Sequence, residues 1–572
     1  MYKSVKRATI ILLCVLIGAS MIACNTQGSQ SSSTTKAPSS TTTAPSSTES
    51  QATDPTEVKD PFGKYAPEIT INIVRSLDSS VVFDSTDPNT KSLEENLWAE
   101  AYKDYLGITF NYLWTPTPEQ YDTKWNTAIA SSDIPDIGVV NGVIYQTLVE
   151  GNLVEDCTEA FNDYASDIYK SCFLEVTGDS GVALNMMTFD GKLLGIPVPG
   201  ICPESVAHLW IRKDWLDAVG MTEPKTIDDL IKTAQAFVDA ELGGTNTIGI
   251  ALSKEVGNMR GFMDGCNAYY NMWIENDSGE LVFGTIQPEM EEALLLLQQM
   301  YRDGLIREDF AVLDYNTAGQ DCGAGKCGIQ YGGNINSITT LKASIVEDLS
   351  SEWKPIQIPT LDGSPAKPSS SATPSSFVFV RAGYEYPEAA VKLTNLNFKL
   401  ILEQPVPYSN SAEDGGLNTN KYIFPGNTAL PWQNLIMHEA ILDAITSGDT
   451  SDLNAIQLLT YGRVVKGMAD RTDSPEPNTT RLLIFGENGS YAHVKEYRDS
   501  GRIVLSAYQS FPTKTMLTLG DTLEENLNAA ILKVIMGDNI TTFQKAAQEW
   551  KRGGGDTITQ EVNEWFTQSK NG

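Results

Sequence analysis

The stretch ITFNYLWTPTPEQYDTKWNTAIASSDIPDIGVV, residues 108–140, holds three successive elements of secondary structure. Residues 108–114 predict a strand. Residues 118–131 predict a helix with Tyr121, Trp125 and Ile129 on one face, because residues four apart lie on the same side of a helix. Residues 131–140 predict a turn and a further strand. This order of elements is typical of an α/β layer.

The residues before this stretch extend the pattern. EITINIV, residues 68–74, alternates apolar and polar side chains and predicts a strand. LEENLWAEAYKDYLG predicts an amphipathic helix, with Leu93, Leu97, Ala101 and Tyr105 on one face and Gly107 as its stop. The resulting strand–helix–strand–helix–strand run predicts a largely parallel sheet with helices on both faces.

A second α/β block is predicted after Pro197. Its expected strands are VAHLWI (206–211), TIGIALS (247–253) and GKCGIQYGG (325–333), and its expected helices cover 226–242 and 288–304. Thr226 has Asp229 three residues on, which favours a helix N-cap there. Near the end of the chain, Thr522 and Glu525 have the spacing of a capping box and predict a helix over 522–538.

The composition excludes some classes of partner. The chain has 572 residues, 41% of them hydrophobic, and a formal net charge of −32. A body of this length exceeds a single hydrophobic core, so two or more lobes are expected. The negative charge argues against nucleic-acid binding, which needs basic patches, and against docking on anionic lipid.

The first residues predict export. Lys3, Lys6 and Arg7 precede an apolar run that ends near Ile22, which fits a secretory signal over 1–23 and is too short for an ordinary spanning helix. The sequence MIAC, ending at Cys24, resembles the bacterial lipobox, in which cleavage falls before a cysteine that carries a diacylglycerol. The alternative is a plain signal peptide with a chance cysteine.

Residues 24–66 are expected to form a disordered tether on this lipid anchor. Half of residues 25–60 are Ser or Thr, and such a segment buries too little apolar surface to offset its chain entropy. The body keeps six cysteines, Cys157, Cys172, Cys202, Cys266, Cys322 and Cys327. Their even number allows disulfides, with 157–172 and 322–327 the first pairs to test, and free thiols are the alternative. The histidines, His208, His438 and His493, are scattered in sequence, which disfavours a zinc site.

Several segments resemble one family. They are KWNTAIASSDIPDIGVV (124–140), DGKLLGIPV (190–198), LWIRKDWLDAVGMTEPKTIDDLIKTAQAF (209–237), YRDGLIREDF (301–310), GKCGIQYGG (325–333) and YPEAAVKLTN (386–395). In this order they are similar to extracellular solute-binding proteins of the sugar-binding class. The resemblance covers roughly residues 68–400, and its most specific segment is 209–237.

The resemblance implies a two-lobed α/β fold of the periplasmic-binding-protein type (type 2), with ligand in the cleft between the lobes. It implies lobe 1 over 67–203 and 359–403, and lobe 2 over 204–358 and 404–572. The crossovers are expected near 197–205, 358–360 and 402–407. The implied protein is a monomeric substrate-binding lipoprotein of an ABC importer, anchored outside a Gram-positive-type cell, with permease subunits as partners.

Ligand contacts are expected beyond the carboxyl ends of the strands. Amides and carboxylates suit sugar hydroxyls, and aromatic rings suit the apolar faces of a pyranose. The candidates are Asp78, Trp114, Asn141, Glu204, Tyr270, Trp273, Tyr331, Asn334 and Trp432. Each has a plainer interpretation as a core or turn residue.

No metal, cofactor or catalytic residue is expected. Relatives often carry a calcium-loop-like segment after the helix that ends here at Phe237, whereas this chain has DAELGGTNTIG (239–249), with too few alternating carboxylates. No motif of a phosphate loop, a zinc protease or a serine hydrolase is complete. Two alternatives stay open: a cell-surface polysaccharide-cleaving enzyme, which needs two carboxylates across a cleft, and a sensor lipoprotein that presents a solute to a signalling partner.

Overall fold

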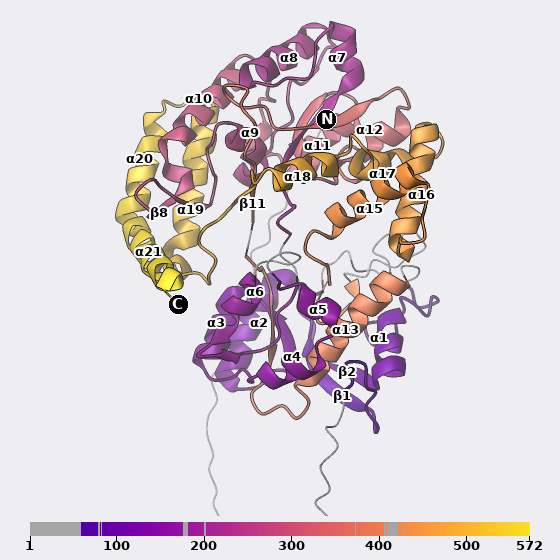
Figure 1. Cartoon of the computed structure of the whole chain (residues 1–572). Helices are drawn as coiled ribbons and strands as arrows, with labels where there is room; N and C mark the ends of the chain where they lie inside the picture. Colours follow the sequence, from indigo (N-terminus) through magenta and orange to yellow (C-terminus); the bar gives the residue numbers. More distant parts are fainter. Residues whose placement is uncertain are drawn as a thin grey trace, which may run out of the picture. The chain divides into compact units, whose positions relative to one another are not determined.

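The computed structural model describes residues 59–77, 81, 83–174, 181–199, 202–371, 373–404, 408, 421–426 and 428–571. Two large hydrophobic cores organise this part of the chain. The core of the first lobe draws on residues 71–196 and 377–424, with Phe511 added from far along the chain. The core of the second lobe draws on residues 206–366 and 435–562. The fold is therefore α/β with two lobes (Figure 1).

The first lobe contains the predicted strands. β1 (Ile69–Val74) and β2 (Ile108–Trp114) pair in parallel, with Ile69 opposite Ile108. β3 (Ile137–Val140) pairs antiparallel with β12 (Phe377–Val380), which returns from the second lobe. A small hairpin joins β4 (Thr188–Phe189) to β5 (Lys192–Leu193).

The helices of the first lobe confirm one prediction in full and correct another. The predicted helix over 118–131 is α2 (Pro118–Ser131), and its Trp125 is buried. The helix expected from Leu93 begins only at Leu97, because the Asn96 side chain accepts the N–H groups of Trp98 and Ala99, both at 3.0 Å, and so caps α1. Tyr105 was expected on the buried face and is 44% exposed.

The remaining helices of the first lobe cover the sheet and its return strand. Helix α13 packs against α4 and α5 (Figure 1). The elements are α1 (Leu97–Ala101), a π-helical turn (Tyr102–Leu106), α3 (Gly142–Glu150), α4 (Thr158–Tyr164), α5 (Asp167–Ser171), α6 (Val182–Met186) and α13 (Glu388–Glu403).

The sheet of the second lobe is antiparallel, unlike the largely parallel sheet predicted for the first α/β run. Its strand order is β10–β6–β9. The central strand β6 (His208–Arg212) pairs antiparallel with β9 (Ile329–Gly332) on one side and with β10 (Trp353–Ile356) on the other. Residues 247–253 make only isolated bridges, at Ile248 and Ala251, rather than a strand. A hairpin of β7 (Trp273–Glu275) and β8 (Leu281–Phe283) completes the described strands of this core.

The starts of two helices in the second lobe are set by N-terminal capping residues. Helix α8 has the predicted capping box between Thr226 and Asp229. The late helix begins at Lys514 with Thr513 as its cap, so Thr522 lies inside it and the predicted box there is wrong. The elements are α7 (Lys213–Val219), α8 (Ile227–Asp239), α9 (Arg260–Gly265), α10 (Pro288–Arg302), α11 (Tyr315–Gly323), α12 (Lys342–Glu347), α19 (Lys514–Ile535), α20 (Thr541–Trp550) and α21 (Asp556–Asn571).

Residues 440–510, which carry no recognisable motif, form mostly helices of the second lobe. They continue α15 (Gln433–Ser447) and add α16 (Ala455–Ala469), α17 (Asn478–Phe485) and α18 (Ser490–Asp499). Val464, Phe485, Val494 and Tyr497 belong to the second core. The segment is therefore part of the folded scaffold.

The chain passes between the cores near residues 197–205, 367–376 and 425–434. The sequence had placed the second and third of these crossovers at 358–360 and 402–407. In the second crossover, β11 (Ser369–Ser370) pairs in parallel with β13 (Val504–Leu505). Among the described residues, no helix has the length and apolarity to cross a membrane, and the six cysteines named above are free thiols.

Candidate functional site

Three cavities lie around the crossovers. Cavity A has a volume of about 610 Å³, and its lining includes Val143 of the first lobe, crossover residues Ser370, Ser371 and Thr373, and many residues of the second lobe. Cavity B, of about 440 Å³, lies on the first lobe. Cavity C, of about 480 Å³, lies against the first crossover and the second lobe. All three have the size of small-molecule sites.

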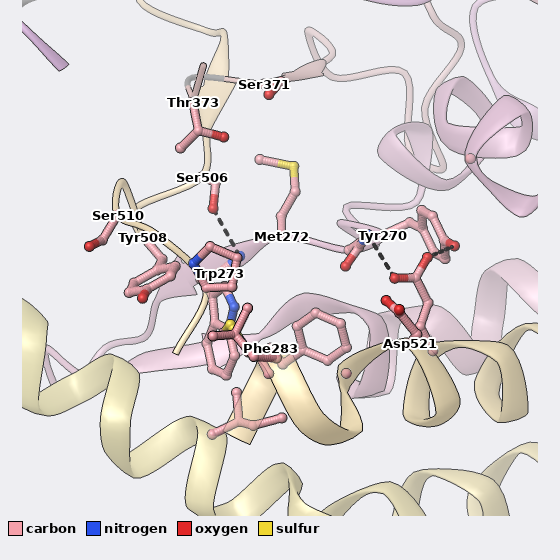
Figure 2. Close-up of a pocket in the computed structure, with 18 of the residues that line it drawn as sticks. Tyr270, Met272, Trp273, Phe283, Ser371, Thr373, Ser506, Tyr508, Ser510 and Asp521 are labelled. Carbon is pink, nitrogen blue, oxygen red and sulfur yellow. Dashed lines mark hydrogen bonds between the residues drawn. The ribbon is translucent and has the colours of Figure 1, made fainter. Parts of the chain in front are cut away.

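Cavity A has an aromatic floor. Trp273 and Phe283, which face each other across the β7–β8 hairpin, have ring centroids 5.3 Å apart, and Phe283 stacks on Trp550 of α20 at 4.9 Å and 8°. Figure 2 shows Trp273 and Phe283 near Tyr508, with Ser371 and Thr373 across the cavity. Trp273, Phe283 and Trp550 are only 5–8% exposed and belong to the second core, so they form an apolar wall of the cavity, and the hydroxyls supply hydrogen-bonding groups.

One end of cavity A is acidic. Glu524 accepts hydrogen bonds from the Tyr270 hydroxyl at 3.2 Å and from Asn271 Nδ2 at 3.4 Å. Asp521, one turn earlier on α19, is exposed and lines the same cavity (Figure 2). Burial raises the pKa of Tyr270, so its hydroxyl keeps its proton as a donor. A ligand here meets a fixed acceptor and an accessible carboxylate.

Cavity B lies at the carboxyl ends of β1 and β3, where ligands bind in open α/β sheets. Its lining includes Arg75 and Asn141, which follow those strands, and Gly426 of the third crossover. Arg75 Nη1 donates to the Ile423 carbonyl at 3.0 Å, and burial lowers its pKa. The Asn141 side chain accepts the Ile144 N–H at 3.0 Å and so caps α3.

Cavity C brings three predicted residues together. Glu204, Tyr331 and Asn334 all line it. Asn334 Nδ2 donates to the Glu204 carbonyl at 2.7 Å, and Asn334 Oδ1 lies 2.7 Å from His208 Nε2. Cavities A and C share Gly257 and Arg260, so they adjoin each other.

The Glu204 carboxylate holds two crossovers together. It is 3% exposed and accepts N–H groups from the start of α15, at 3.1 Å from Leu435 N and 3.1 Å from Asn434 Nδ2. Burial raises the pKa of Glu204, while these donors oppose the shift. Negative charge near a helix N-terminus is favourable. The geometry makes Glu204 a structural anchor whose oxygen atoms already have partners.

A second buried carboxylate anchors the second crossover. Asp264 of α9 is 1% exposed, and it accepts the Ser369 N–H at 2.8 Å and the Ser369 hydroxyl at 2.8 Å. Burial raises the pKa of Asp264 to about 7. Ser369 precedes the crossover residues that line cavity A, so Asp264 fixes one end of that wall.

The other predicted residues lie apart from these cavities or outside the described residues. Trp114 packs edge to face on Trp125 at 5.3 Å in the first core and does not line cavity A, B or C. Trp432 precedes α15, has a left-handed backbone at φ 59° and packs on the second core. It does not line cavity A, B or C. Asp78 and Cys24 fall outside the described residues.

Several cavity residues carried no signal in the sequence. Arg260, Ser371, Tyr508 and Trp550 come from segments far apart, and only the fold brings them together. The histidines are closer than their spacing suggested, since the His208 and His493 rings lie 6.1 Å apart. In the described part of the chain, no group of three or more His, Cys, Asp or Glu side chains is arranged to hold a metal ion.

Known proteins resemble this chain over most of its length. The Bacillus subtilis polygalacturonan/rhamnogalacturonan-binding protein YtcQ is 23% identical over 80% of this chain and 85% of its own length. Lipoprotein LipO of the same organism is 22% identical over 88% of this chain and 93% of its own length.

Solved structures share the fold. The substrate-binding protein FusA of Streptococcus pneumoniae, in complex with kestose, has a TM-score of 0.57 and 15% identity, and the match covers 88% of this chain and all of FusA. These neighbours are solute-binding proteins of ABC transporters, so the fold is of the periplasmic-binding-protein type. A sequence model described as bacterial extracellular solute-binding protein matches residues 84–396, more than half of the chain. The chain therefore belongs to the bacterial extracellular solute-binding protein family.

Proposed function

We propose that this protein captures an oligosaccharide in the cleft formed by cavities A, B and C and delivers it to a membrane permease. The observation that carries the proposal is the lining of cavity A. It combines an aromatic floor of Trp273, Phe283 and Trp550 with hydroxyl and carboxylate groups, and it includes residues of both lobes and the second crossover. Pyranose rings have apolar faces and hydroxyl rims, which match such a lining.

The ligands for which the relatives are named support this class of solute. YtcQ is named for polygalacturonan and rhamnogalacturonan, and FusA is named as a fructooligosaccharide ABC transporter substrate-binding protein. A similar solved structure from Bifidobacterium longum is an HMO-binding protein associated with an ABC transporter, with a TM-score of 0.56 and 13% identity. The relatives are binding proteins, which favours capture over cleavage here.

Hinge closure is the proposed mechanism. Ser370, Ser371 and Thr373 belong to the second crossover and line cavity A, so a ligand there touches the segment about which the lobes would turn. Val143 of the first lobe lines the same cavity. A ligand that contacts both lobes favours the closed form, because only differential contacts shift such an equilibrium.

The remaining parts of the proposal follow from the sequence. A diacylglycerol on Cys24 would hold the protein outside the cell membrane, and residues 24–66 would tether the body within reach of the permease. The protein would work as a monomer without metal or cofactor. The sensor lipoprotein and the polysaccharide-cleaving enzyme are the alternatives.

A binding screen tests the proposal. The purified full chain is titrated by calorimetry with neutral and acidic oligosaccharides, and the sugar is recovered and sized after long incubation. The proposal expects micromolar or tighter binding of at least one oligosaccharide, which is recovered intact. Shortened sugar would favour the enzyme, and no binding across the panel would refute capture.

A further inference from the structure

The chain as a whole is acidic, but cavities B and C each have an arginine in their lining. The chain has a formal net charge of −32, yet in the described part of the chain Arg75 is the only charged side chain that lines cavity B. Cavity C is lined by two, Glu204 and Arg260. The Glu204 oxygens already accept N–H groups from α15, so Arg260 is the charged side chain of cavity C to consider for a ligand.

Arg260 is placed at the junction of two cavities. It is the first residue of α9, is half-buried, and lines both cavity A and cavity C. Its Nη2 donates to the Ser205 carbonyl at 3.1 Å. No ion pair within 4 Å joins it to a carboxylate among the residues that the structure describes; its charge acts on the buried Asp264, whose two oxygens accept hydrogen bonds from Ser369. A guanidinium has five N–H donors in a planar fork, so donors remain for a ligand.

The local surroundings fix what this guanidinium would bind. A half-buried arginine without a carboxylate partner loses solvation that an anion restores, and a carboxylate accepts two of its N–H groups in parallel. The acidic end of cavity A lies at Asp521 and Glu524 of α19, whereas Arg260 is on α9. Sugar hydroxyls can donate to the acidic end at Asp521 and Glu524, and a ligand carboxylate can accept from Arg260.

We infer that the oligosaccharide captured in this cleft is acidic, and that Arg260 pairs with a uronate carboxylate at the junction of cavities A and C. This inference rests on the proposed function, because it names the ligand class of the same cleft. Arg260 is then a specificity-determining residue. It distinguishes acidic from neutral chains of the same length and linkage.

Matched pairs of probes test the inference. Calorimetry compares oligogalacturonates and oligomannuronates with their carboxyl-reduced counterparts, which differ only in the charged group, on wild type, Arg260→Gln and Arg260→Lys. Arg302→Gln is the control, since Arg302 is exposed on α10 and lies outside the three cavities. Thermal melts confirm that each variant is folded.

The expected result is that wild type prefers an acidic probe over its reduced form. Arg260→Gln should lower affinity for the acidic probe by about 10- to 100-fold, the range for a lost charged hydrogen bond, and leave the reduced probe within about twofold. Arg260→Lys should keep part of the preference, and Arg302→Gln should keep all of it.

Three results would count against it. Equal binding of acidic and reduced probes by wild type overturns the inference and leaves the proposed function standing, and this comparison needs no variant to fold. A preference that survives in Arg260→Gln also overturns it. Failure of every probe, acidic or neutral, overturns the proposed function itself.

Discussion

Glu204 Oε2 accepts the backbone N–H of Leu435 at 3.1 Å, so a residue of the first crossover caps α15, the helix that begins at Gln433 in the last residues of the third crossover. Asn334 Nδ2 donates to the Glu204 carbonyl from the end of β9. Two of the three connections between the lobes are thus tied together by one side chain. This arrangement gives Glu204 a structural role at the hinge, and its direct contact with a ligand stays a prediction.

Truncating Glu204 should therefore destabilise the fold. Glu204→Ala leaves the buried N–H of Leu435 and the half-buried side-chain N–H of Asn434 without an acceptor, which costs about 2 kcal/mol. The measurement is the thermal unfolding midpoint. Glu204→Gln should lose less because its carbonyl oxygen still accepts, and Glu487→Ala, at an exposed carboxylate, should leave the midpoint unchanged. Equal melting of Glu204→Ala and wild type would contradict the anchoring role.

Asp264 should make stability depend on pH. Burial raises its pKa to about 7 in the folded chain, above the ordinary value of 3.8. Between these values the folded chain holds a proton that the unfolded chain has released, so this group's favourable contribution is complete below about pH 4 and is lost as the pH rises through about 7.

Asp264→Asn removes that titration and keeps an acceptor for Ser369. We expect the variant to gain stability relative to wild type when the pH is raised from 5 to 8, as measured by the difference between their unfolding midpoints. Asp277→Asn, at an exposed carboxylate, is the control and should show no such change. A difference that is constant with pH would rule out Asp264 as the titrating group.

The aromatic floor of cavity A should contribute to affinity. Trp273→Phe keeps a ring against Phe283 but makes the apolar wall of cavity A smaller, and we expect about a tenfold loss of affinity, or ~1.4 kcal/mol. Calorimetry with an oligosaccharide bound by wild type measures it. Trp98→Phe changes a buried ring in the first core and should bind as wild type does. Unchanged affinity in Trp273→Phe would show that this aromatic cluster does not contribute to the binding site.

Membrane attachment should depend on one thiol. Cys24→Ala removes the residue that would carry the diacylglycerol, and the protein should then appear in the medium or the soluble fraction. Fractionation of cells with detection by antibody checks this, with Cys202→Ala as the matched control that should stay with membranes. Retention of the Cys24→Ala protein in the detergent-extracted fraction would refute the anchor.

The sequence predicted the elements whose signals are local. Helix α2 begins at Pro118 and ends at Ser131 as expected, and the Thr226–Asp229 box caps α8. Each signal lies within one turn of the element it defines. The capping box predicted at Thr522 is wrong because the helix begins nine residues earlier, where Thr513 caps α19.

The site was predicted only in part, for reasons of tertiary structure. Tyr270 and Trp273 line cavity A as candidates drawn from one short aromatic segment. Trp550 and Arg260 line the same cavity from helices almost three hundred residues apart in sequence. No local sequence pattern predicts that these two residues lie close together. Asn141 follows a strand and Glu204 lies at the first crossover, which makes both candidates for ligand contact, and the structure shows that their side-chain oxygen atoms also cap helices.

Hydrogen–deuterium exchange with and without a bound oligosaccharide tests the central claim most directly. Capture between the lobes predicts protection in residues 141–145 of the first lobe, in 270–273 of the second lobe and in the crossover at 369–373. It also predicts protection in residues 506–521, which line cavity A and whose Phe511 packs in the first core. Protection confined to one lobe, or found instead on the surface groove between α11 and α12 near Asn316 and Glu347, would contradict capture in the interlobe cleft.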